Sequence, residues 1–110
     1  PLVELAQAAW LNLRLFSDDI ADVEKLSPVE ERAEHLRLFL DAYGLSASDR
    51  EGFFNTMLEF VMCDTAYQAD EAGITNDSND QEALWGLAWR ARSGAWLVRH
   101  REIFERTILA

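Results

Sequence analysis

Residues 53–67 read FFNTMLEFVMCDTAY, and this stretch decides the fold. Its apolar side chains recur three and four positions apart, which is the spacing of one side of an α-helix. They cover a wide part of the helix surface, from Phe53 and Met57 to Met62 and Tyr67. Because a helix buries its apolar face, a face this wide predicts a helix at the centre of the core with other helices packed around it.

Capping signals set the ends of this central helix. Ser48 and Glu51 have the spacing of a capping box, and Gly73 is typical of a residue that ends a helix in the left-handed conformation. The helix is therefore predicted over 48–72. The same reasoning predicts four more helices, over 2–16, 28–43, 80–93 and 95–109, with a break near Gly94 between the last two.

These elements predict an all-α fold, an irregular bundle of four to five helices that forms a single domain over residues 1–110. No segment alternates apolar and polar residues as a half-buried strand would. Polar stretches at 17–26 and 75–80 are the predicted loops. The chain opens at Pro1 without Met and enters a helical pattern at once, so we expect it to be a fragment of a longer chain.

Charge and composition exclude several kinds of partner. The 110 residues include 20 acidic and 10 basic side chains, and the net charge of −10 disfavours nucleic acid. Only the segment 86–110 is basic, which predicts an electrostatic match with the acidic remainder.

No stretch is long and apolar enough to span a membrane, and no signal peptide is apparent. The single cysteine, Cys63, is expected to be buried, and a reducing cytoplasm is the expected location.

The sequence contains no recognisable catalytic or metal-binding motif. It lacks a glycine-rich phosphate loop, a zinc-type group of Cys and His, and a serine nucleophile elbow. The lone His35 and His100 are interpreted as surface or capping residues. Asp64, Trp85 and Trp89 are candidate ligand-binding residues, since carboxylates and aromatic rings bind cationic groups. Core packing and a solvated helix face are the simpler explanations for these three.

Three segments are typical of one known family when they are read in order. They are PLVELAQAAW at 1–10, HLRLFLDAYGLSASDREGF at 35–53 and AWLVRHREIFERTIL at 95–109. Together they resemble the C-terminal helical subdomain of aminoglycoside phosphotransferase-like (choline kinase-like) small-molecule kinases. This resemblance implies that the chain is the C-terminal part of a kinase-like large lobe and helps to bind an acceptor substrate, with a cationic acceptor slightly favoured.

The resemblance also implies roles for the rest of the parent chain and for particular residues. Upstream kinase-like lobes would supply the catalytic residues, ATP and magnesium, so this fragment alone would not be catalytic and would hold no cofactor or metal. Asp18 and Asp19, after the first helix, are the preferred acceptor contacts, ahead of the three candidates named above. Glu4 stands where the family has Asp and would support the upstream catalytic loop.

Two other functions fit the same residues. The first is an independent helical protein-interaction or ligand-binding module without enzymatic activity. The second is the helical ligand-binding domain of a transcription regulator, whose DNA-binding part would lie upstream. A large exposed apolar patch on the isolated chain would favour the fragment of a larger enzyme, whereas a clean monomer without such a patch would favour the independent module.

Overall fold

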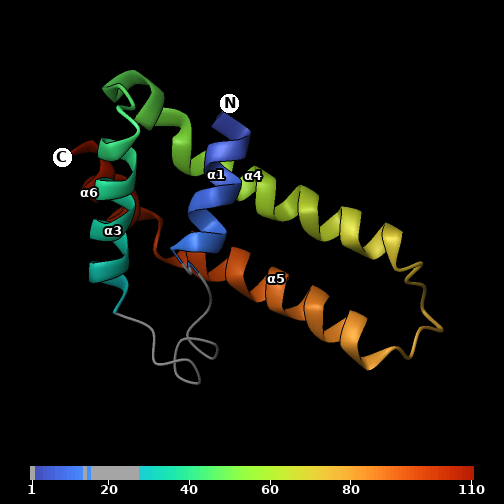
Figure 1. The fold of residues 1–110 in the computed structure, drawn as a ribbon. Coiled ribbons are helices and arrows are strands. Elements are labelled where there is room, and N and C mark those ends of the chain that lie inside the picture. Colours follow the sequence, from blue (N-terminus) through green and yellow to red (C-terminus); the bar gives the residue numbers. More distant parts are fainter. Residues whose placement is uncertain (1, 14, 16–27) are drawn as a thin grey trace.

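The computed structural model describes residues 2–13, 15 and 28–110, and this part of the chain contains five α-helices and no strand (Figure 1). The helices are α1 (Leu2–Asn12), α3 (Val29–Ala42), α4 (Ala47–Glu71), α5 (Gln81–Arg99) and α6 (Arg101–Leu109). The prediction of an all-α bundle is confirmed.

Helices α4 and α5 form a long hairpin, and the other helices gather at one end of it (Figure 1). α1 packs against α4, and α6 packs against α3 and α4. The second half of α4 and the first half of α5 extend away from this body, with residues 72–80 at the tip. The molecule therefore has a closed end, where the helices surround a core, and a projecting end made of the hairpin alone.

Local sequence signals explain where the hairpin helices begin and end. Ser46, and not the predicted Ser48, caps α4 by accepting a hydrogen bond from the Asp49 backbone N–H at 3.2 Å. Asp80 caps α5 by accepting one from the Ala83 backbone N–H at 3.2 Å. Gly73 follows α4 with a positive φ of 63°. That left-handed conformation suits glycine, so the predicted stop at this residue is confirmed.

The core at the closed end is rich in aromatic rings. Phe54 of α4 stacks on Phe104 of α6 with centroids 5.7 Å apart, and Trp96 of α5 meets Phe104 edge-on, also at 5.7 Å. Arg32 of α3 is almost fully buried, with its guanidinium carbon 4.3 Å from the centre of the Trp96 ring. A cation over a tryptophan face compensates part of the cost of burying the charge.

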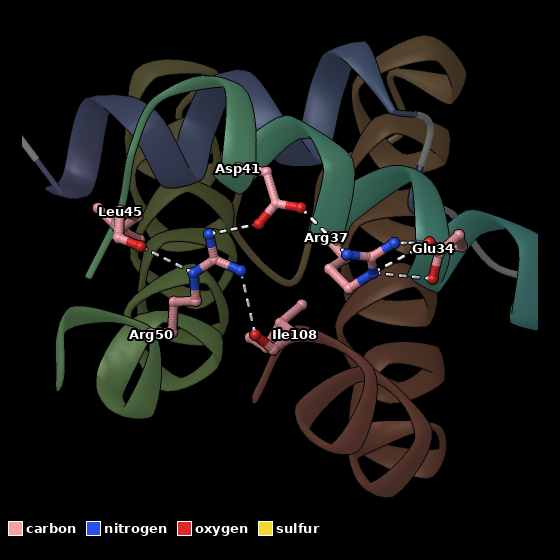
Figure 2. A network of polar contacts seen from close by, with 6 residues as sticks. All are labelled: Glu34, Arg37, Asp41, Leu45, Arg50 and Ile108. Carbon is pink, nitrogen blue, oxygen red and sulfur yellow. Dashed lines mark hydrogen bonds and ion pairs between the residues drawn. The ribbon is translucent and has the colours of Figure 1, made fainter. Parts of the chain in front are cut away.

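Arg50 joins three parts of the closed end (Figure 2). Its guanidinium donates to the carbonyl of Leu45 at 2.9 Å, to the carbonyl of Ile108 at 3.3 Å and to the carboxylate of Asp41 at 2.7 Å. The Ile108 carbonyl lies in the last turn of α6, where it lacks a helical partner, and the Leu45 carbonyl lies in the turn between α3 and α4. This one side chain therefore ties α4 to the end of α3, to the following turn and to the end of α6.

A second arginine extends the same network along α3. Arg37 lies between Glu34 and Asp41, pairing with Glu34 and reaching the Asp41 carboxylate at 3.1 Å (Figure 2). The hydrogen bond from Arg37 lowers the pKa of Glu34, and the same bond raises the pKa of Arg37. Both shifts favour the charged forms at neutral pH.

The helix boundaries agree with prediction within about a residue for α3 and α4, but two predictions were wrong. The first helix, expected over 2–16, ends at Asn12. The expected break near Gly94 is absent, because α5 continues to Arg99 and the chain turns only at His100. Gly94 faces α4 instead: a Cβ there would lie 3.5 Å from Val61, which is an ordinary contact distance, so this approach of α4 and α5 does not require glycine.

The burial of some apolar side chains also differs from prediction. Cys63 was expected to be buried but is exposed. Met62 and Tyr67, expected on the core face, are 75% and 58% exposed. The cause is shared: the second half of α4 extends beyond the helices that cover the first half, so part of its apolar surface has no neighbour among the described residues.

Candidate functional site

An open apolar groove of about 930 Å³ runs between α4 and α5. α4 supplies one wall, which includes Leu58, Met62, Ala66 and Ala69, and α5 supplies the other, which includes Ala88, Ala91, Ala95 and Val98. The volume falls within the range of sites that hold sizeable ligands. Two other surface hollows, of about 280 and 350 Å³, are smaller.

Small side chains on α5 explain why the groove is open. Ala91, Gly94 and Ala95 project little, so α4 and α5 touch deep in the groove, near Val61, and leave its outer part unfilled. Larger apolar groups then line its edges, with Val98 55% exposed. Contiguous exposed apolar surface of this kind marks interaction sites in folded proteins.

Apolar side chains cover two sides of α4. One side packs in the core, and the other forms a wall of the groove. Phe53 and Met57 point into the core and are fully buried. Leu58 and Met62 line the groove instead. The sequence analysis assigned both sets to one wide core-facing surface and so missed the groove. The available signal was an apolar arc wider than one packed neighbour needs, followed by an α5 segment rich in alanine and glycine.

The α4 helix and the tip of the hairpin are strongly acidic. Residues 51–89 contain no Lys, Arg or His, but they contain these acids: Glu51, Glu59, Asp64, Asp70, Glu71, Asp77, Asp80 and Glu82. All of them except Asp64 are exposed. The later part of α5 has the opposite sign, since residues 83–101 contain four arginines and no acid.

The two arginines that line the groove do not cancel the charge of these acids. Arg90 pairs with Asp64 at 3.0 Å, and Arg101 pairs with Glu105 at 3.1 Å while it also donates to Asn55 at 2.7 Å. Arg90 sits toward the tip and Arg101 at the closed end of the groove. Each is matched by a carboxylate, so the exposed acids dominate the field near the tip.

A smaller polar hollow continues the groove toward the tip. It has a volume of about 280 Å³ and shares Leu87 and Arg90 with the groove. Gln68, Asp80 and Glu82 complete its lining. The two hollows together form an apolar trough with an acidic end, which is a shape and charge pattern suited to an elongated ligand.

The structure brings two of the predicted ligand-binding residues together. Arg90 pairs with Asp64, and its guanidinium carbon lies 5.2 Å from the centre of the Trp89 ring. Trp89 also packs on Trp10 of α1 with centroids 5.3 Å apart, so it contributes to the core. Trp85 is 48% exposed. None of the three candidates lines the groove itself, and their part in binding stays a prediction.

The remaining predicted site residues lie elsewhere. Glu4 is exposed in the first turn of α1, beside a shallow hollow of about 350 Å³ that Tyr43 also lines. Asp18 and Asp19 fall outside the described residues. Within residues 2–13, 15 and 28–110, no group of three or more His, Cys, Asp or Glu side chains could hold a metal ion. None of the described helices is long and apolar enough to cross a membrane.

The fold and its groove define a helical bundle with a projecting two-helix arm. Over 106 residues the chain is 48% identical to the trifolitoxin immunity protein of Rhizobium leguminosarum bv. trifolii. The match covers 96% of this chain and 41% of that protein, so the chain spans about two fifths of the length of the relative. No family model matches the chain, and no solved structure matches it.

This match corrects the interpretation drawn from the family resemblance. The relative is named as an immunity protein, which contradicts the prediction of a kinase subdomain with kinase-like lobes and a small-molecule acceptor. The three motifs misled because leucines at helical spacing, a glycine after a helix and tryptophans in a terminal helix are needed by many helical bundles. ATP and magnesium, expected for a longer chain, stay a prediction. The alternative of a helical interaction or ligand-binding module agrees better with the match.

Proposed function

We propose that this chain is a helical binding module that serves in immunity to a toxin and acts by holding a partner in the groove between α4 and α5. The observation that carries the proposal is the groove, whose apolar walls are exposed although the rest of the bundle buries a well-packed core. The similarity to an immunity protein over 96% of the chain supports the biological role.

The energetics of the groove favour binding. Burying an exposed side chain such as Met62 or Val98 stabilises a complex by about 1.5–3 kcal/mol before the cost of association. Two helices already packed at Val61 and Gly94 hold the walls in place, so little ordering is needed when a partner docks. A pre-formed apolar groove of this kind holds its ligand by shape and burial, without bond-making chemistry.

Protection of a sensitive cell tests the proposal. We expect a trifolitoxin-sensitive strain that produces the chain to grow in the presence of the toxin. Ala91→Trp fills the groove from an exposed position on α5, and we expect it to abolish protection. Ala47→Trp, at an exposed position at the start of α4 and outside the groove, is the matched control and should protect fully. Equal protection by both variants would contradict the proposal.

A further inference from the structure

We infer that Asp64 and Arg90 are positioning residues, which hold α4 and α5 at the separation that keeps the groove open and its walls fixed. This inference rests on the proposed function and deepens it, because it names the pair on which the shape of the binding site depends. The pair acts on a partner through the two walls and not by binding the partner itself.

The part of the hairpin that carries the tip half of the groove has no fully buried side chain. Val61 is the last buried residue of α4, and Ser93 is the first buried residue of α5. Residues 62–92 between them form the projecting arm, in which every side chain is partly or fully exposed. Burial therefore holds the two helices together less firmly in the arm than at the closed end.

A polar contact joins the two helices where this burial ends. Asp64 Oδ2 accepts a hydrogen bond from Arg90 Nε at 3.0 Å. Across the whole of α4 and α5, which the structure describes in full, this is the only hydrogen bond or ion pair between the two helices. The side chains are 19% and 23% exposed. A charge-assisted bond with little access to solvent is strong and directional, so it restrains the separation of the helices where packing is weak.

Neighbouring groups hold the two side chains in place. Gln68 Nε2 lies 3.5 Å from the other oxygen of Asp64. Arg90 Nη1 donates to the carbonyl of Gly86 at 3.1 Å, and its guanidinium carbon lies 5.2 Å from the centre of the Trp89 ring. A Cβ at position 86 would lie 3.3 Å from this Nη1, so glycine gives the guanidinium room against the helix. The arginine is therefore fixed to α5 before it reaches across to α4.

The position of the pair links it to the shape of the groove. Arg90 lines both the groove and the polar hollow toward the tip, so the pair joins the walls at the tip end of the groove. At the closed end, Arg101 also lines the groove and donates to Asn55 of α4 at 2.7 Å. Both arginines of this largely apolar groove thus reach back to α4. Walls that are fixed in advance reduce the ordering cost of binding.

A distance measurement by pulsed EPR tests the positioning role directly. The natural Cys63 on α4 and a Gln81→Cys substitution at the start of α5 carry the two spin labels, and both positions are exposed. Asp64→Ala removes the acceptor, and we expect the distance between the labels to shift to longer values and to become more broadly distributed. Arg90→Met breaks the pair from the other side and should have the same effect.

Two further variants serve as controls in the same measurement. Asp64→Glu keeps a carboxylate that can still reach Arg90, so it should keep a narrow distribution of label distances. Asp70→Ala makes the same change of charge at an exposed position of α4 and should leave the distances unchanged. Near-ultraviolet circular dichroism of the buried tryptophans checks that each variant keeps the closed end folded.

Protection of trifolitoxin-sensitive cells links the pair to binding. The apparent affinity of a site falls in proportion to the fraction of time for which it is competent. Walls that keep the productive separation for about a tenth of the time would therefore bind about tenfold more weakly. We expect Asp64→Ala and Arg90→Met to lower the tolerated toxin concentration by about this factor, whereas Asp64→Glu and Asp70→Ala should protect like the unsubstituted chain.

The outcomes separate this inference from the proposed function. Unchanged label distances in Asp64→Ala and Arg90→Met would overturn the positioning role and leave the groove to the test by Ala91→Trp. Longer distances with full protection, in cells that Ala91→Trp fails to protect, would also overturn it, because the groove would then bind without fixed walls. Protection that Ala91→Trp leaves intact would overturn the proposed function, whereas the label distances would still decide whether the pair holds the helices.

Discussion

The two halves of α4 have similar apolar content but different surroundings. In the first half, Phe53, Phe54 and Met57 are fully buried among α1, α5 and α6. In the second half, Met62 and Tyr67 are exposed. The closed end also has the polar network of Arg50 and Asp41 (Figure 2), whereas the projecting end has an acidic rim. The difference shows that one helix can supply both a core and a binding surface, with stability concentrated at one end.

The largest expected effect is the loss of a core ring from the closed end. Trp96→Ala removes a fully buried side chain that contacts Phe104 and His100. A cavity of this size should lower the free energy of unfolding by about 3–5 kcal/mol, measured by urea denaturation. Trp85→Ala, at a 48% exposed position on the projecting end, should cost less than about 1 kcal/mol. Equal losses in the free energy of unfolding would contradict the proposed difference in stability between the two ends.

An intermediate effect is expected from the polar network. Arg50→Met keeps the apolar length of the side chain but leaves the carbonyls of Leu45 and Ile108 without this donor. We expect a loss of about 1–3 kcal/mol in the free energy of unfolding. Arg106→Met breaks an exposed ion pair with Glu102 and should cost about 0–1 kcal/mol. An unchanged free energy of unfolding in Arg50→Met would show that this network does not stabilise the closed end.

The smallest effect concerns pH. Because Arg37 lowers the pKa of Glu34 below the ordinary 4.5, the ionised carboxylate is favoured in the folded state. Its contribution to stability is present above that ordinary value and is lost as the pH falls below it, through the lowered pKa. When the pH is lowered from neutral to acidic, the Glu34→Gln variant should therefore lose slightly less free energy of unfolding than the unsubstituted chain. Thermal melting at a series of pH values measures the difference, and a steeper loss in the variant would contradict it.

The sequence predicts the helices well because their signals are local. Apolar spacing, the caps and Gly73 act within a few residues, so the class of fold and most helix ends follow from them. The groove depends on which helices cover α4, and that is a property of the assembled bundle. The motif at 35–53 is likewise explained by helix packing and a glycine stop, so it carried no information about enzymatic chemistry. Gly94 was misread for the same reason, since its contact is with Val61 on another helix.

The two methionines of the chain offer the most direct test of the central claim, that the exposed second side of α4 is a binding surface. Met57 is fully buried in the core, and Met62 is 75% exposed in the groove. In a methyl NMR titration of the chain with a synthetic amphipathic helix that has Leu on one face, the Met62 signal should shift until saturation while the Met57 signal stays in place. An unchanged Met62 signal, or equal shifts of both signals, would contradict the account.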